Sequence, residues 1–127
     1  MHIDEINVRS GLVVDAAMRV HTALGPGLME GAYEACLAYE LRKRGLRVLV
    51  QHPLPLVYDG VWIELGYRVD LLVDDVIVVE LKAIAKLLPI HDAQLLSYLK
   101  LSERRVGLLI NFHTQHLKDG IKRMLND

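Results

Sequence analysis

The sequence has little of what marks an exported or membrane-spanning protein. Its 127 residues include one cysteine, Cys36, which excludes an intramolecular disulfide and gives no sign of an oxidising compartment. No window reaches the roughly 20 apolar residues of a membrane span. Charged residues also interrupt the apolar core that a signal peptide would need near the N-terminus. We therefore expect a soluble, cytoplasmic protein with no membrane partner.

An excess of positive charge is also missing. The formal net charge is -1, with 15 Lys and Arg against 16 Asp and Glu. Proteins that coat nucleic acid usually carry a strong basic excess, so any contact with nucleic acid must be local. Hydrophobic residues make up 52% of the chain. That content is ample for a single domain with a real core, spanning residues 1–127.

The spacing of apolar residues and turn residues predicts an α/β fold. Gly25-Pro26-Gly27 separates two segments of helical spacing, so the chain should open as a helical hairpin. Short β-branched runs follow, and Asp59-Gly60 is typical of a hairpin turn. We expect helices at 3–24, 28–44, 91–101 and 115–125, and strands at 46–50, 54–58, 61–65, 67–73, 76–84 and 105–112. Most strand pairs should be antiparallel, but a strand, a crossover helix and a strand imply one parallel pair.

The stretch 70–82, Asp-Leu-Leu-Val-Asp-Asp-Val-Ile-Val-Val-Glu-Leu-Lys, is the most informative part of the chain. Side chains alternate faces along a strand at about 3.3 Å per residue, so Glu80 and Lys82 should point the same way, roughly 6.6 Å apart. Apolar neighbours make both strands interior, and buried acids need partners or a metal. Asp70 and Glu80 could hold Mg²⁺ while Lys82 orients a water for phosphodiester hydrolysis. Lys82 could equally be only the ion-pair partner of these acids.

Residues 27–33, Gly-Leu-Met-Glu-Gly-Ala-Tyr, spell Gly-x-x-Glu-x-x-Tyr. In this motif and over nearly its full length, including 91–100 and 107–112, the chain resembles the GxxExxY proteins. That family is grouped with the PD-(D/E)XK nuclease superfamily. The resemblance implies a restriction-endonuclease-like core, in which a central mixed sheet is flanked by helices.

The resemblance also implies roles for individual residues. Asp70 matches the first-strand acid of the superfamily, Glu80-Leu81-Lys82 matches its Glu-x-Lys, and Glu30 matches the acid on the preceding helix. The proline of the superfamily motif is missing, since Val69 precedes Asp70.

A second motif, Gln94-x-x-x-Tyr98, resembles the Gln-x-x-x-Tyr of RecB-like and lambda exonuclease-like members. Residues four apart share one helix face, so Gln94 and Tyr98 can both face the substrate. The alternative is that the amide and the phenol simply pack at the boundary between helix and sheet.

Several of these residues also have a purely structural interpretation. Glu30 lies in the first turn of its helix, where an acid is favoured in any case. Tyr33 is more typical of a core aromatic with a satisfied hydroxyl. His21 fits a helix-end residue better than a metal ligand, and Trp62 is expected to serve packing.

The sequence therefore predicts a Mg²⁺-dependent phosphodiesterase, with Mn²⁺ as an alternative metal, acting on nucleic acid and preferentially on DNA. The predicted metal ligands are Asp70, Glu80 and Glu30, Lys82 joins them as a catalytic residue, and Gln94 and Tyr98 are predicted to bind the substrate. A domain this small has little surface for reading bases, which favours specificity for the structure or the ends of the nucleic acid, or help from a homo-oligomer or a protein partner. The alternative is a nuclease-fold accessory or binding module that acts through a protein or nucleic-acid partner.

Overall fold

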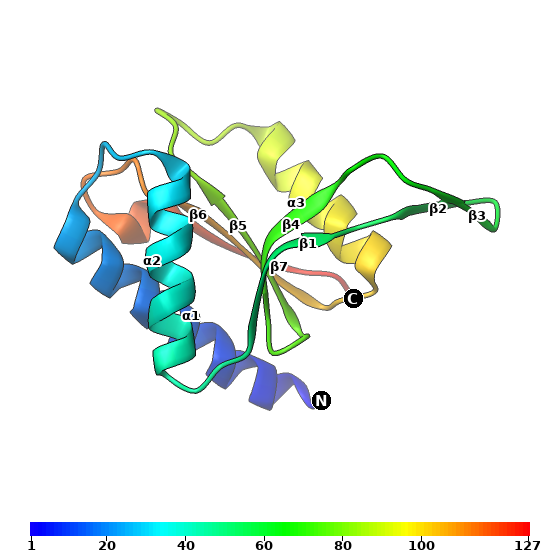
Figure 1. Cartoon of the computed structure of the whole chain (residues 1–127), viewed down its shortest axis with the longest axis horizontal. Coiled ribbons are helices and arrows are strands. Elements are labelled where there is room, and N and C mark those ends of the chain that lie inside the picture. Colours follow the sequence, from blue (N-terminus) through cyan, green and yellow to red (C-terminus); the bar gives the residue numbers. More distant parts are fainter.

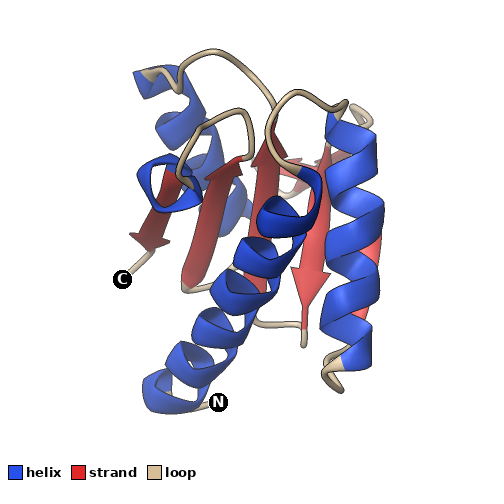
Figure 2. Cartoon of the chain, turned by 90° about the vertical axis from the view of Figure 1, so that its left-hand side faces the viewer, coloured by secondary structure: helices blue, strands red, loops and turns tan.

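A five-stranded mixed sheet separates α1 and α2 on one face from α3 on the other (Figure 1, Figure 2). The computed structural model describes residues 1–127. The elements in chain order are α1 (Ile3–Leu24), α2 (Glu30–Lys43), β1 (Val48–Pro53), β2 (Leu56–Tyr58), β3 (Val61–Ile63), β4 (Arg68–Val73), β5 (Ile77–Lys82), α3 (Pro89–Ser102), β6 (Val106–Asn111), the 3₁₀ turn η1 (Leu117–Gly120) and β7 (Ile121–Leu125). The sheet has the order β1-β4-β5-β6-β7, and only β5 and β6 are parallel. The predicted α/β class and the parallel pair bridged by α3 are confirmed.

The sheet has a core on each face, and the two cores differ in size. The core under α1 and α2 contains 21 buried residues, whereas the core under α3 contains eight. Strand β5 contributes to both, because successive side chains alternate faces. Val79 and Leu81 lie in the larger core and Val78 in the smaller one. Glu80 and Lys82 therefore lie on the α3 face, in line with Val78.

The loop between α1 and α2 is held by Tyr33. The Tyr33 hydroxyl donates to the carbonyl of Gly25 at 2.5 Å and accepts from the amide of Leu28 at 3.1 Å. Its ring stacks on Phe112 with a centroid distance of 4.4 Å. The structural interpretation of Tyr33 is therefore confirmed, and its effect is to hold the loop immediately before Glu30. None of the helices combines the length and apolar character that crossing a membrane requires.

The predicted helix at 115–125 is wrong. This segment forms η1 and then β7, which pairs antiparallel with β6. The helical spacing came from three apolar residues four apart, Leu117, Ile121 and Leu125. Every residue of β6 is buried, so without β7 its outer edge would keep unpaired backbone groups, and edge pairing outweighs local periodicity. Gly120 allows the chain to enter β7, since a Cβ there would collide with the carbonyl of Asn111.

The three strands predicted between 46 and 65 do not form one sheet. β1 joins the main sheet, whereas β2 and β3 pair only with each other. Asp59 and Gly60 have φ values of 54° and 74°, as expected for the predicted hairpin turn. The expectation that Trp62 serves packing is not met, because 73% of the surface of Trp62 is exposed. The hairpin extends away from the body of the molecule (Figure 1).

Candidate active site

β4 and β5 separate where they carry Asp70 and Glu80. Their register pairing runs from the turn only as far as Leu71 and Val79. Beyond that pair, the Asp70 amide donates to Glu80 Oε1 at 3.1 Å, and the Leu81 amide donates to Asp70 Oδ2 at 2.8 Å. Each carboxylate thus replaces a backbone acceptor of the ladder on the opposite strand. The two predicted acids are held side by side, because hydrogen bonds from backbone amides to carboxylates are strong.

Glu80 is the most deeply buried acid of the chain, with 6% of the residue exposed. Burial, with a further contribution from the negative charge of Asp70, raises the pKa of Glu80 to about 8. The hydrogen bond from the Asp70 amide and the positive charge of Lys82 oppose this rise without cancelling it. Two adjacent carboxylates of which one is desolvated favour binding of a cation, because a cation removes the cost of ionising both.

Lys82 follows Glu80 on the same face, as the sequence predicts. The seven ion pairs of the chain leave the Lys82 ammonium with no carboxylate partner within 4.0 Å. Its charge nevertheless lowers the pKa of both Glu30 and Glu80 relative to the effect of burial alone. The ammonium is therefore near the acids without being locked to one of them, which leaves its protons available for another oxygen.

α2 brings two more acids to this end of the sheet. The pKa of Glu30 is raised, first by burial and then by the charge of Asp70. The pKa of Glu34 is raised for the same two reasons, with a hydrogen bond from Gln51 opposing them. Glu34 is not among the predicted site residues, although its spacing of four from Glu30 on a helix places both on one face.

Gln51 is a second residue of the site that was not predicted from the sequence. It lies between Val50 and His52, which pair with Leu71 and Val69 of β4. Its Nε2 donates to Glu34 Oε2 at 2.8 Å and to Asp70 Oδ1 at 3.0 Å. Its φ of 53° is rare for a residue other than glycine, and residues with such unusual backbone conformations are often found at functional sites. The alternation of β4 breaks at the same point, with Val69 in the α3 core and Leu71 in the α1/α2 core. Asp70 therefore lies between a residue of the α3 core and a residue of the α1/α2 core. Nothing in the local sequence around Gln51 indicates that its side chain would contact Asp70.

α3 presents the predicted pair Gln94 and Tyr98. Gln94 Nε2 donates to the Tyr98 hydroxyl at 3.1 Å, which confirms that the two side chains share a face. The pKa of Tyr98 is raised by burial and then by the negative charge of Glu80, which places the phenol on the side of the acids. The pair therefore borders the carboxylates, with its polar atoms linked to one another.

The donor set suits a hard divalent cation. No three His, Cys, Asp or Glu side chains lie close enough together to hold a metal by themselves. His21, whose Nε2 lies 2.8 Å from the carbonyl of Thr114, serves structure at the end of α1. Mg²⁺ usually keeps several waters and takes one or two carboxylates together with substrate phosphates. Asp70 and Glu80, with Glu30 nearby, fit this requirement.

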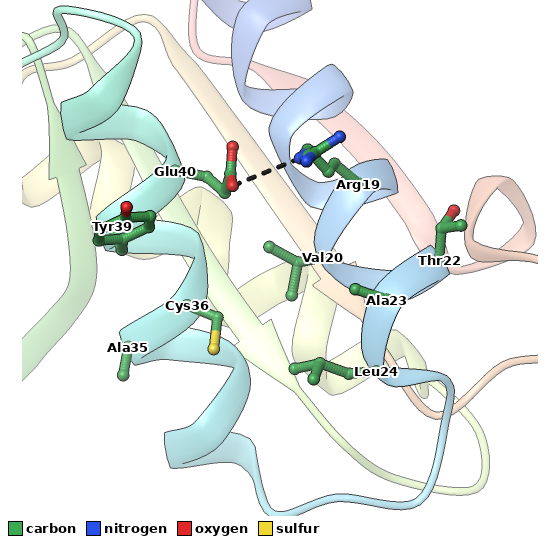
Figure 3. Close-up of a pocket in the computed structure, with 9 residues that line it drawn as sticks. All are labelled: Arg19, Val20, Thr22, Ala23, Leu24, Ala35, Cys36, Tyr39 and Glu40. Atoms are coloured by element: carbon green, nitrogen blue, oxygen red, sulfur yellow. Dashed lines mark ion pairs between the residues drawn. The ribbon is translucent and has the colours of Figure 1, made fainter.

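The largest cavity of the molecule lies elsewhere. It is a groove of about 660 Å³ between α1 and α2, lined by Arg19, Val20, Thr22, Ala23, Leu24, Ala35, Cys36, Tyr39 and Glu40 (Figure 3). Its charged groups are already paired with each other, Arg19 to Glu40 at 3.5 Å. None of the acids with raised pKa values lines the groove, and most of the residues that line it are apolar. Perturbed acids, rather than cavity size, identify the candidate active site.

Comparison with known proteins assigns the chain to a superfamily. A model of the PD-(D/E)XK nuclease superfamily matches residues 7–124, and the chain belongs to this superfamily. No curated protein and no solved structure matches the chain. Nucleases of this superfamily generally use divalent metals such as Mg²⁺ or Mn²⁺, and the family implies a nucleic-acid substrate.

Proposed function

We propose that this member of the superfamily is a divalent-metal-dependent nuclease that hydrolyses phosphodiester bonds, preferentially in DNA. The observation that carries the proposal is the reciprocal hold of Asp70 and Glu80 at the point where β4 and β5 separate. Lys82 lies two residues further on the same face. The Gly-x-x-Glu-x-x-Tyr of residues 27–33 supports the narrower proposal that the chain is a GxxExxY protein.

Asp70 and Glu80 would hold Mg²⁺ or Mn²⁺, and Glu30 would act as a further ligand or orient one. When bound, such a metal lowers the pKa of a water and offsets charge on the phosphoryl group. The raised pKa of Glu80 supports this assignment, because a bound cation favours the ionised form that burial disfavours. Gln51 and Glu34 would act as positioning residues, since Gln51 donates to the second oxygen of Asp70 and Glu34 accepts from the same Gln51 amide.

Lys82 would orient the attacking water, because its ammonium is near the acids and has no ion-pair partner. Gln94 and Tyr98 would contact the substrate from α3, with the Tyr98 phenol beside Glu80. The roles of Lys82, Gln94 and Tyr98 are predictions. A single domain over residues 1–127 and a cytoplasmic location are also predictions from the sequence.

Calorimetric titration of Mg²⁺ and Mn²⁺, paired with cleavage of labelled single-stranded, double-stranded and branched DNA and RNA, tests the proposal. We expect wild type to bind metal and cleave, and Asp70→Asn to do neither. Asp75→Asn is the matched control, because Asp75 lies in the turn at the other end of the same strand pair. Its φ of 61° is one that asparagine tolerates.

Two other outcomes would be informative. If wild type cleaves no substrate with any divalent ion, the nuclease proposal is wrong and the binding-module alternative replaces it. If Asp75→Asn loses activity together with Asp70→Asn, the loss reflects the fold of the strand pair rather than the carboxylate.

A further inference from the structure

The hairpin arm, defined here as residues 55–67, concentrates exposed apolar side chains. It consists of β2, the turn, β3 and their flanks, and projects beyond the body of the molecule (Figure 1). Trp62 is 73% exposed and Tyr58 is 71% exposed. The exposed large apolar residues of the arm are Val57, Tyr58, Val61, Trp62, Leu65 and Tyr67. Single exposed apolar residues are ordinary, but a contiguous group marks an interaction surface.

The arm lacks what a two-stranded hairpin needs for stability on its own. β2 and β3 are three residues each and belong to no larger sheet. Such a hairpin is marginally stable in water unless it gains further strands or packs on a helix. Val57 and Trp62 line a small cleft of about 220 Å³ that faces the end of α3, yet Trp62 keeps most of its surface exposed. A partner that adds strands would supply the missing stabilisation.

The charge of the arm favours protein over nucleic acid as that partner. Residues 55–67 include two acids, Asp59 and Glu64, and no Lys, Arg or His. Stacking aromatics on a nucleic-acid surface are normally accompanied by basic residues that neutralise phosphates. The arm would instead repel phosphates, whereas its β-branched and aromatic residues suit strand pairing.

The free edge of β3 is self-complementary. The residues that flank a two-residue turn form a hydrogen-bonded pair, so by alternation Val57 and Trp62 form a non-hydrogen-bonded pair. The amide and carbonyl of Trp62 therefore point away from β2. Neither proline nor lysine protects this edge, although natural edge strands usually carry such residues.

We propose that β3 pairs antiparallel with β3 of a second copy of this chain, about a twofold axis at Trp62, and that the two arms form one four-stranded sheet. In this register Val61 of one copy faces Ile63 of the other, Glu64 faces Gly60, and Asp59 faces Leu65. No acid faces an acid, so the register avoids like-charge contact. An isologous contact of this kind closes as a dimer.

The exposed apolar side chains of the arm supply part of the area that a standard dimer interface buries, and the backbone of the paired β3 strands adds to it. Buried aromatic side chains each cover about 150–250 Å², so the exposed parts of Trp62, Tyr58 and Tyr67 offer roughly 300 Å² per copy. Val57, Val61 and Leu65 add apolar surface on the same arm. A standard interface takes about 800 Å² from each partner. The proposal does not depend on nuclease activity, because the four-stranded sheet of the two arms is separate from the sheet that carries the candidate active site.

Sedimentation velocity over a concentration series tests the dimer. We expect wild type to dimerise, and Trp62→Lys to weaken dimerisation by about 30-fold or more, because it removes a central aromatic and charges the edge. Tyr39→Lys is the matched control, since Tyr39 is 64% exposed on α2 outside the arm. Trp62 is the sole tryptophan, so wild-type emission should shift to the blue as concentration rises.

Cross-linking tests the register even if Trp62→Lys fails to fold. In a Cys36→Ser background, Trp62→Cys should cross-link with a short bis-maleimide, because paired Cα atoms lie about 5.5 Å apart. Asp59→Cys should not, because the two thiols would be about 20 Å apart, six residues along the strands. The proposal would be overturned if wild type is monomeric, or if Trp62→Lys leaves dimerisation unchanged. It would also be overturned if Asp59→Cys cross-links as well as Trp62→Cys. Emission that responds to nucleic acid and not to protein concentration would assign the arm to nucleic acid instead.

Discussion

The two faces of β5 differ in what their side chains do. Val79 and Leu81 point into the large core beneath α1 and α2, where the surrounding residues are apolar. Glu80 and Lys82 point toward α3, where the buried cluster is smaller and borders polar side chains. The difference teaches that the fold can accept desolvated acids on one face because the other face supplies most of the hydrophobic stabilisation. Substitutions one residue apart should therefore separate activity from stability.

Lys82→Met should show the largest effect, and it should be on activity alone. We expect cleavage to fall by roughly 10²–10⁴-fold, as for loss of a group that positions or moves a proton. The free energy of unfolding should change little, because the Lys82 ammonium forms no ion pair that folding would lose. Single-turnover cleavage and urea denaturation measure the two quantities. Lys86→Met, in the exposed loop that follows, is the control, and equal loss in both variants would mean that general charge rather than Lys82 matters.

Leu81→Ala should show the complementary result. Leu81 is fully buried in the α1/α2 core, and Leu→Ala substitutions in such cores cost about 2–5 kcal/mol. The hydrogen bond to Asp70 comes from the Leu81 backbone amide and is kept. Urea denaturation should show the loss, while cleavage at a temperature where the variant stays folded should approach that of wild type. If cleavage instead falls as far as in Lys82→Met, the two faces are not separable.

The raised pKa of Glu80 should make the stability of the fold depend on pH. Its pKa is raised from the unfolded value of 4.5 to about 8 in the folded state. Between these values the folded protein holds a proton that the unfolded chain has released, so stability should fall as pH rises from about 4.5 to 8. The expected loss is a few kcal/mol in metal-free buffer. Glu80→Gln should flatten the profile, and Mg²⁺ should restore stability at pH 8 in wild type alone. A flat wild-type profile in chelator would show that Glu80 is ionised without a metal.

The parts of the site that the sequence predicts are those set by local rules. Alternation along one strand places Glu80 and Lys82 on one face, and the turn at Asp74 and Asp75 brings Asp70 beside them. Spacing of four places Gln94 and Tyr98 together on α3. Each of these inferences needs only one element or one hairpin, so no knowledge of the sheet order is required.

The parts that the sequence could not predict depend on which strands become neighbours. Gln51 reaches Asp70 only because β1 pairs with β4 rather than with β2, and its left-handed backbone has no signature in a Val-Gln-His stretch. The spacing of apolar residues in β7 predicts a helix, but the segment pairs with the edge of β6. The need of that edge for a partner is a feature of the tertiary structure and cannot be read from local spacing. Trp62 is exposed because β2 and β3 leave the main sheet.

Tyr33→Phe should show the smallest effect, and it tests whether the α1/α2 face also supports the site. The ring would stay stacked on Phe112, but the Gly25 carbonyl and the Leu28 amide would lose their partner. We expect a loss of about 1–2 kcal/mol in unfolding free energy. Because this loop precedes Glu30, cleavage should fall by less than about tenfold. Tyr39→Phe, at an exposed tyrosine of the same helix, should change neither quantity. If Tyr33→Phe lowers stability and leaves cleavage intact, α2 supports the fold without holding Glu30 in place, and the division between the two faces is sharper still.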